Sequence, residues 1–304
     1  MKRFLVTGGA GFIGSHLVDR LISGNEITVI DNLSSGKKEF INIKTKFYEK
    51  DLINFNHILD LFEDIDTVFH VAANPDVKLS AVETKVHFDQ NIVATYNVLE
   101  AMRKNDIDKI VFTSSSTIYG RAPIPTPEDY GPLIPESIYG ASKLACEGLI
   151  SSYCHTFGFK SWIFRFANII GGKSNHGIIP DFIGKLRNNP LELEILGDGN
   201  QTKSYLYIDE CLDQILFAFR NSHDRVNIFN IGSEDHVSVT KIAEIVCSKM
   251  GLSPKFRFTG GDIGWKGDVP MMLLSINKLK RLGYVPQHSS LYSVNKAVEA
   301  TLNG

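Results

Sequence analysis

The chain is poor in cysteine and shows no pattern of metal ligands. Its cysteines number four, at positions 146, 154, 211 and 247, and no Cys-x-x-Cys pair occurs. We therefore expect reduced thiols that pack in the interior, as is usual for cytoplasmic proteins. The nine histidines form no cluster with metal-ligand spacing, so no metal is expected either.

Long apolar runs and an excess of charge of one sign are also missing. No stretch of about 20 apolar residues occurs, as a membrane helix would need, and the glycines near the N-terminus indicate a turn rather than a leader segment. Lys and Arg number 32 and Asp and Glu 34, a net charge of −2. This balance provides no electrostatic argument for a nucleic acid or membrane partner. We expect a soluble cytoplasmic protein.

The N-terminal segment has the pattern of a strand, a glycine-rich turn and a helix. Residues 2–7 are expected to form a strand with an apolar centre, and they lead into Gly8, Gly11 and Gly14. Gly8 permits a tight turn, Gly11 lets a pyrophosphate approach the main chain, and Gly14 lets the helix pack closely. The helix that follows presents its N-terminus to the phosphates. The pattern predicts a dinucleotide-binding turn.

Asp31 predicts which dinucleotide is bound. It ends a second apolar run, residues 27–30. A carboxylate at this position accepts hydrogen bonds from the adenosine ribose and repels a 2′-phosphate. The predicted cofactor is therefore NAD rather than NADP.

Tyr139 and Lys143 are four residues apart, the spacing that places two side chains on one face of a helix. A free tyrosine titrates near pH 10 and is a poor base at neutral pH. A fixed ammonium nearby favours the phenolate, which can take a proton from an alcohol. The alternative interpretation is an ordinary surface pair, and the glycine turn in the same chain favours the catalytic one.

Short β-branched runs alternate with helical patterns in the first half of the chain. Strands are expected at 65–70 and 109–113, and helices at 91–103 and 143–157. This alternation predicts an α/β fold with a doubly wound parallel sheet of the Rossmann type, whose ligand lies at the carboxyl ends of the strands.

The pattern changes after residue 166. A glycine-rich loop is expected at 171–177, and amphipathic helices at 179–187 and 239–250. We expect an NAD-binding Rossmann domain at 1–166. Residues 167–304 then form a smaller, mainly substrate-binding domain, with some segments returning to the first.

Taken together, these motifs resemble the extended short-chain dehydrogenase/reductase family, and within it the UDP-glucose 4-epimerases, especially those of archaeal type. The resemblance covers nearly all of the chain. Its main segments are 7–14, 31–36, 51–52, 70–75, 113–120, 139–143 and 165–168, with Asn91 between them. It implies NAD as cofactor, a UDP-sugar as substrate, and a homodimer formed by helices at 91–104 and 139–157.

The resemblance also implies a set of site residues. Tyr139, Lys143 and Ser115 are the catalytic residues, with Ser115 bridging the sugar 4-hydroxyl and the phenol. The cofactor-binding residues are Gly8, Gly11, Phe12, Ile13, Gly14, Asp31, Asn32, Ser35, Gly36, Asp51, Leu52, Ala72, Ala73, Asn91, Ser114, Tyr139, Lys143 and Phe166. The substrate-binding residues are Ser115, Thr117, Tyr139, Asn168, Lys203, Trp265 and Asp268. The alternative for the serines at 114–116 is that they satisfy main-chain groups of a turn.

Two positions after Ser115 limit the chemistry. The sugar-nucleotide 4,6-dehydratases carry an Asp-Glu pair there, and the UDP-glucuronate decarboxylases a glutamate. This chain has Ser116 and Thr117, neither of which can act as a carboxylate acid or base. The resemblance therefore implies C4 epimerisation of UDP-glucose and UDP-galactose through a 4-keto intermediate. The alternatives are a 4-epimerase of UDP-N-acetylhexosamine or UDP-hexuronate, another NAD-dependent reductase or dehydratase, and a non-catalytic dinucleotide sensor.

Two departures from the family pattern leave the diphosphate contact open. Trp265 and Lys203 stand where arginines are usual. Lysine supplies charge without the bidentate fork of arginine, and Lys203, Lys266 and Arg257 are all candidates, each with solvated surface charge as the alternative. Trp265 either stacks on the uracil or packs a domain interface.

Three other residues carry weaker expectations. His70 is expected to be a packed or capping histidine rather than a catalytic one. His176 is a candidate ligand contact in its glycine-rich loop, and Glu128 is expected to face solvent.

Overall fold

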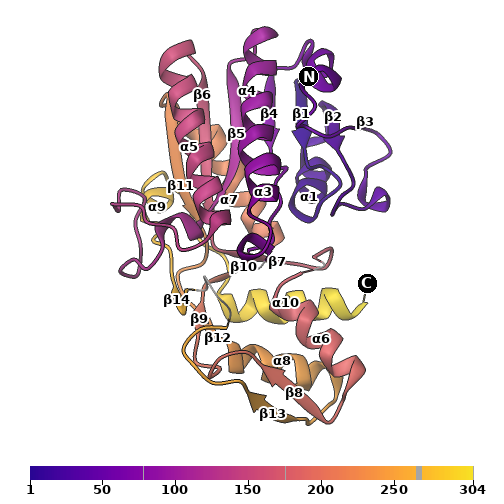
Figure 1. Cartoon of the computed structure of the whole chain (residues 1–304), viewed down its shortest axis with the longest axis vertical. Helices are drawn as coiled ribbons and strands as arrows, with labels where there is room; N and C mark the ends of the chain where they lie inside the picture. Colours follow the sequence, from indigo (N-terminus) through magenta and orange to yellow (C-terminus); the bar gives the residue numbers. More distant parts are fainter. Residues whose placement is uncertain (78, 175, 265–268, 304) are drawn as a thin grey trace.

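A seven-stranded sheet forms the larger part of the protein (Figure 1). The computed structural model describes residues 1–77, 79–174, 176–264 and 269–303. The strands of this sheet are β1 (Arg3–Thr7), β2 (Glu26–Asp31), β3 (Lys46–Glu49), β4 (Thr67–His70), β5 (Lys109–Ser115), β6 (Lys160–Phe166) and β11 (Val226–Ile231). Their order across the sheet is β11-β6-β5-β4-β1-β2-β3, and every neighbouring pair is parallel. The predicted doubly wound sheet is confirmed.

The chain reverses its direction of travel across the sheet between β1 and β4. It runs from β1 outward through β2 to β3, then returns beside β1 and continues through β5 and β6. In open parallel sheets a crevice forms at such a reversal, outside the carboxyl ends of the strands. The fold therefore directs a ligand to the ends of β1 and β4.

Helices cover both faces of the sheet, so alternate strand residues enter two different cores. Phe4 and Val6 of β1 belong to a core with α1 (Phe12–Leu21) and α7 (Ile208–Asn221). Leu5 belongs to the opposite core, with α4 (Ala94–Lys104) and α5 (Ile138–Phe157), the two helices in front of the sheet in Figure 1. All four cysteines are buried free thiols, as expected.

Both helices of the second face begin earlier than the sequence pattern suggested. The one expected at 91–103 is preceded without interruption by α3 (Thr84–His87) and a π-helical segment, η4 (Phe88–Val93). The one expected at 143–157, and at 139–157 as a dimer helix, begins at Ile138, because the Ser137 hydroxyl accepts a hydrogen bond of 3.0 Å from the Gly140 amide and caps the helix. Tyr139 therefore lies in the first turn of α5, on a helix as expected.

A smaller part lies beyond the carboxyl ends of the sheet strands (Figure 1). Its own core contains α6 (Ile178–Asn188), α8 (Val239–Met250) and α10 (Ser290–Asn303). Short strands connect it to the sheet or pair within it: β7 (Asn168–Ile170), β8 (Glu192–Ile195), β9 (Thr202–Lys203), β10 (Tyr205–Tyr207), β12 (Val237–Ser238), β13 (Lys255–Phe258) and β14 (Met271–Met272). The helices expected at 179–187 and 239–250 are confirmed.

The remaining elements are short. They are α2 (Phe55–Ile58), α9 (Asn277–Arg281), η1 (Lys38–Phe40), η2 (Leu59–Phe62), η3 (Leu79–Ala81) and η5 (Ser116–Tyr119). Across the ranges given above, the structure contains no helix with the length and apolar character to cross a membrane.

Gly14 generates a stability prediction. A Cβ on Gly14 would lie 2.1 Å from the Gly8 carbonyl oxygen, whereas a Cβ on Gly184 in α6 would meet nothing within 4 Å. We expect Gly14→Ala to destabilise the protein by about 1–3 kcal/mol, because main-chain atoms must shift. Gly184→Ala, its matched control, should stabilise by about 0.5–1 kcal/mol. Urea titrations of both variants measure this, and a Gly14→Ala protein as stable as the native one would contradict it.

Candidate active site

The glycine turn between β1 and α1 leaves no room for side chains. Gly8 has a φ of 73°, and a Cβ there would lie 2.7 Å from the Ala72 main chain. Helix α1 begins at Phe12 with Gly11 as its N-cap, and no side chain caps it. The amide groups of its first turn, which include those of Phe12 and Ile13, therefore point at the crevice as a site for an anion.

Asp31, the last residue of β2, lies against this turn. One carboxylate oxygen accepts from the Ala10 amide at 2.9 Å and the other from the Leu33 amide at 2.8 Å. Burial raises the pKa of the carboxyl, and the two amides oppose that shift. A carboxylate has about four acceptor sites, so capacity remains for ribose hydroxyls.

The other predicted cofactor residues follow the carboxyl ends of neighbouring strands or lie on η4. Gly36 packs on Ala10, where a Cβ would lie 2.9 Å from the Ala10 carbonyl carbon. Asp51 accepts from the Asn32 amide group at 3.1 Å. The remaining members follow β2, β3 and β4 or lie on η4: Ser35, Leu52, Ala72, Ala73 and Asn91.

Tyr139, Lys143 and Ser115 come together at the carboxyl end of β5. Tyr139 and Lys143 are one turn apart on α5, and Ser115 is the last residue of β5. Ser115 hydrogen-bonds to the Tyr139 phenol. The Lys143 ammonium donates to the Thr113 carbonyl at 2.9 Å and lies 6.0 Å from the centroid of the Tyr139 ring.

The electrostatics of this trio correct one expectation. Lys143 was expected to lower the pKa of Tyr139, but burial raises that pKa to about 12, and the Ser115 hydrogen bond only partly opposes the shift. Burial also lowers the pKa of Lys143 to about 8. The reason is desolvation: both groups lose water, and the ammonium is directed to a carbonyl rather than to the phenol.

Thr117 orients Ser115. Its amide donates to the Ser115 hydroxyl oxygen at 3.2 Å, and its own hydroxyl donates to the same oxygen at 2.9 Å. With both lone pairs engaged, Ser115 presents its proton to a different acceptor. Ser114 differs, because its hydroxyl donates away from the crevice to Glu147 at 2.5 Å.

The predicted substrate residues lie where the sheet meets the smaller part. Asn168 begins β7, directly beyond Phe166 and β6, and its side-chain amide donates to the Ser204 carbonyl at 3.0 Å. The Phe166 side chain is buried in the core under α1 and α7. Lys203 lies on β9, between β12 and β14. Trp265, Lys266 and Asp268 lie outside the described residues.

Arg257 and Glu128 differ from expectation. Arg257 was a candidate for the diphosphate, but its guanidinium pairs with Glu192 and Glu194 on the neighbouring strand β8. Glu128 was expected to face solvent, but it accepts a hydrogen bond of 2.9 Å from the Asn230 amide, and burial raises its pKa. Neither environment is encoded by neighbouring residues in the sequence.

The two histidines singled out in the sequence have different surroundings. His70 is packed, as expected, with ring nitrogens 2.7 Å from the Thr7 hydroxyl and 2.9 Å from the Thr95 hydroxyl. Burial lowers its pKa to about 3. His176 is exposed. No group of side chains suited to a metal ion occurs within the described ranges.

The sequence reasoning missed a buried ion pair beside Lys143. Arg165 on β6 donates to both carboxylate oxygens of Glu147, at 3.1 and 2.8 Å. One feature of the sequence could have indicated that Glu147 belongs near the site. It lies one helical turn after Lys143 and therefore on the same face of α5.

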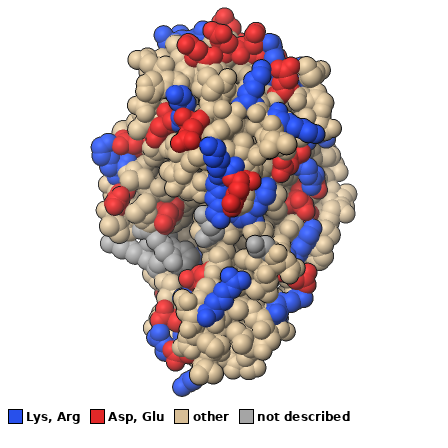
Figure 2. Space-filling model, turned by 90° about the vertical axis from the view of Figure 1, so that its right-hand side faces the viewer, with Lys and Arg blue, Asp and Glu red and all other residues tan. Residues whose placement is uncertain are grey.

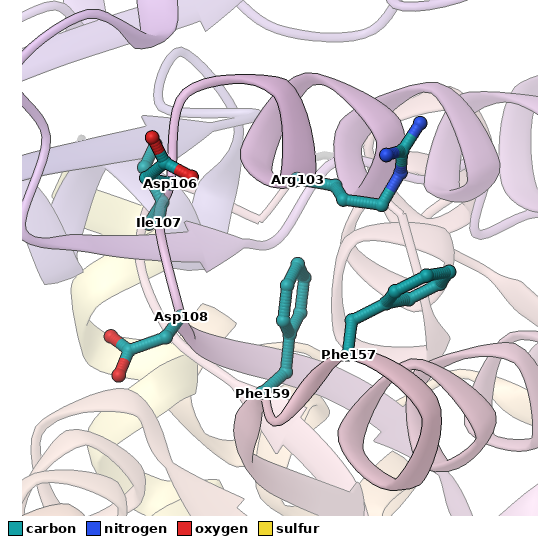
Figure 3. Close-up of a pocket in the computed structure, with 6 residues that line it drawn as sticks. All are labelled: Arg103, Asp106, Ile107, Asp108, Phe157 and Phe159. Carbon is teal, nitrogen blue, oxygen red and sulfur yellow. The ribbon is translucent and has the colours of Figure 1, made fainter.

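Two hollows on the protein lie away from this trio. One of about 270 Å³ is lined by Arg103, Asp106, Ile107, Asp108, Phe157 and Phe159 (Figure 3). Its residues lie in the last turns of α4 and α5 and in the loops that lead to β5 and β6, so it lies at the amino ends of those strands. A second, of about 480 Å³, shares Asp106, Ile107 and Asp108 with it. Neither is the crevice at the carboxyl ends.

Charges of both signs are interspersed on the face of the molecule shown in Figure 2. The net charge is −2. Among the described residues on this face, acidic side chains lie between the basic ones.

Comparison with known proteins places these features in a family. The model described as "NAD dependent epimerase/dehydratase family" matches residues 4–232. A solved UDP-galactose 4-epimerase is 43% identical, with a TM-score of 0.91 and 99% of each chain covered. The UDP-glucose 4-epimerase of Thermotoga maritima, solved with UDP-glucose, is 30% identical, with a TM-score of 0.89 and 99% of each chain covered. A UDP-N-acetyl-alpha-D-glucosaminuronate decarboxylase from Bacillus cytotoxicus is 32% identical over 80% of this chain and 78% of its own.

The resemblance inferred from the motifs is thereby confirmed. The matched region includes the glycine turn, Asp31, Ser115 and the Tyr139–Lys143 pair. It covers more than half of the sequence, and the chain belongs to the NAD dependent epimerase/dehydratase family.

Proposed function

We propose that this protein is a UDP-hexose 4-epimerase that interconverts UDP-glucose and UDP-galactose, with NAD bound throughout the cycle. The observation that carries this proposal is the convergence of Tyr139, Lys143 and Ser115 at the end of β5, next to two positions without a carboxylate. The similarity to solved UDP-galactose and UDP-glucose 4-epimerases supports the substrate.

The crevice fits NAD. Gly14 lets α1 pack closely on the turn, since a Cβ there would lie 2.1 Å from the Gly8 oxygen. The N-terminus of α1 has no side-chain cap, so its first amides can receive a diphosphate. Asp31 is held where the adenosine ribose of a dinucleotide binds in this fold. When bound, NAD⁺ supplies the hydride acceptor for sugar C4 and a positive charge beside the site. Lys143 and Tyr139 are the residues that would hold its nicotinamide half.

Tyr139 and Ser115 handle the proton. As the phenolate, Tyr139 takes the proton of the 4-hydroxyl during oxidation, and the phenol so formed returns a proton during reduction. Ser115 supports this exchange because Thr117 engages its lone pairs and leaves its proton to donate. A donated hydrogen bond favours the phenolate, the direction in which Ser115 shifts the pKa of Tyr139.

The residues after Ser115 favour epimerisation over elimination or decarboxylation. Ser116 and Thr117 provide no carboxylate to remove a second proton or to assist a leaving group. The 4-keto sugar then turns about its link to the diphosphate and accepts the hydride on its other face. Asn168 and Lys203 are the described residues that we expect to hold the nucleotide half, with Trp265 and Asp268 as further candidates.

We also propose a cytoplasmic homodimer that acts in galactose metabolism. The helices at 91–104 and 139–157 are the expected interface. Exposed apolar residues on and beside them support this: Phe88, Tyr96, Ile138 and Phe157 are each more than 40% exposed. Light scattering measures the assembly, and a monomeric mass would contradict the dimer.

The central test is the product mixture. Incubation with UDP-galactose should yield UDP-glucose with no net change in NADH, because the hydride removed from C4 is returned to it. Separation of the nucleotide sugars and absorbance at 340 nm measure both quantities. A 4-keto-6-deoxy sugar would instead indicate a dehydratase, carbon dioxide from UDP-glucuronate a decarboxylase, and steady NADH production a dehydrogenase.

Replacement of the proposed base should stop turnover. Tyr139→Phe removes one hydroxyl and keeps the ring, so the fold and NAD binding should persist. Acid–base groups contribute about 10²- to 10⁴-fold, and we expect kcat to fall at least that far. NAD titration by fluorescence is the control for an intact site. A fall of less than tenfold would overturn the proposed role.

Cofactor choice should depend on Asp31. The native protein should bind NAD in preference to NADP, because a 2′-phosphate would bring like charges together. Asp31→Ala should weaken NAD binding and narrow the difference between the two cofactors. Calorimetric titration of both variants with both cofactors measures this, and equal affinities in the native protein would refute the role of Asp31.

A further inference from the structure

Helix α5 carries three ionisable residues on one face. Tyr139, Lys143 and Glu147 are spaced four residues apart, and this face points toward the ends of β5 and β6. Lys143 and Glu147 are buried, with 3% and 5% of their surface exposed. Nothing in the proposed chemistry uses Glu147, yet buried carboxylates are costly and require partners.

The charge of Lys143 depends on what surrounds it. Its ammonium lies 4.8 Å from the Phe112 ring centroid and donates to the Thr113 carbonyl. Burial lowers its pKa to about 8, while Cys146 and Glu147 act in the opposite direction. Lys143 is therefore close to losing its proton at physiological pH even with Glu147 beside it, and loss of that negative charge would lower its pKa further.

The other titratable neighbours cannot supply that charge at neutral pH. His70 on β4 is neutral, because burial lowers its pKa to about 3. The Cys146 thiol is neutral because burial raises its pKa, and the Tyr139 phenol is neutral with its pKa raised to about 12. Arg165 on β6 is a cation. Among the described groups that act on Lys143, Glu147 is thus the anion.

Glu147 is also rigidly held. Arg165 donates to it through two nitrogens, and the Ser114 hydroxyl donates at 2.5 Å. Charge-assisted hydrogen bonds of this kind are short and strong. Since Ser114 immediately precedes Ser115, Glu147 contacts the end of the strand that carries the proton-handling hydroxyl.

We propose that Glu147 is a positioning residue of this active site: its charge keeps the Lys143 ammonium protonated, and its bond to Ser114 fixes the end of β5 beneath Ser115. This inference rests on the proposed function in one respect: one of its two tests measures turnover of UDP-galactose. Two separate effects follow. Removal of the Glu147 charge would change the protonation of Lys143. Removal of its hydrogen bond to Ser114 would change the position of Ser115.

Two substitutions separate these effects. Glu147→Gln keeps the length and an acceptor oxygen but removes the charge, and it leaves Arg165 as an uncompensated cation. Both changes disfavour the ammonium of Lys143. Glu147→Asp keeps the charge and withdraws the carboxylate by one methylene. The matched control is Glu210→Gln, at a buried glutamate of α7 that accepts from the Gln287 amide.

The first measurement does not need turnover. The ¹³Cε resonance of Lys143, assigned by its absence in Lys143→Arg, is titrated with pH in protein labelled at lysine. Glu147→Gln should lower the midpoint by about one pH unit or more, whereas Glu147→Asp and Glu210→Gln should leave it near the native value. An unchanged midpoint in a folded Glu147→Gln protein would overturn the electrostatic role, whatever the enzyme catalyses.

The second measurement is the pH profile of UDP-galactose turnover by the NAD-bound enzyme. In Glu147→Gln the alkaline limb of kcat should move to lower pH by the shift seen in the titration. In Glu147→Asp the limb should stay in place while kcat falls at all pH values, because Ser114 loses its anchor. A merely structural glutamate would lower the melting temperature in both variants and move neither limb, and that result would refute the proposal. If the native enzyme converted UDP-galactose to a product other than UDP-glucose, the proposed function would be refuted. The lysine titration would then test the role of Glu147 by itself.

Discussion

The buried ammonium of Lys143 is the charge on which the site depends. Only 3% of this residue is exposed, and removal of an ammonium from water is costly unless other groups replace the water. The Thr113 carbonyl provides one replacement, at 2.9 Å. The position of Thr113 in the parallel sheet makes this possible, because the pairing of β5 with β4 ends at Phe112, one residue before it. The Rossmann fold therefore supplies the lysine's first partner before any catalytic group is considered.

The glycine turn imposes the second constraint on the site. The sequence predicted this turn because its requirements are local. Gly14 is required by a contact within the turn, since a Cβ there would lie 2.1 Å from the Gly8 oxygen, and Gly8 is favoured by its own φ of 73°. The same holds for strand periodicity, which gave the sheet, and for the spacing of Tyr139 and Lys143. The start of α5 was also within reach, since Ser137 is a good N-cap residue ahead of a helical pattern.

The features that the sequence could not predict depend on tertiary contacts. Glu147 and Arg165 lie on different elements, and only the packing of α5 on β6 makes them an ion pair. Arg257 resembled a free cation in the sequence, but the parallel pairing of β13 with β8 places it against two glutamates. The pKa of Tyr139 also depends on burial, which no four-residue spacing encodes.

The opposite shifts at Tyr139 and Lys143 determine what a cofactor must add. Burial raises the pKa of the phenol to about 12 and lowers that of the ammonium to about 8, so the chain's own groups favour a neutral phenol. A base at this position requires a further positive charge in the crevice. The oxidised nicotinamide ring of NAD, which Tyr139 and Lys143 would hold, would supply such a charge, and the reduced ring would not. A site built in this way favours the phenolate when the cofactor is ready to accept a hydride, and the phenol when it is ready to return one.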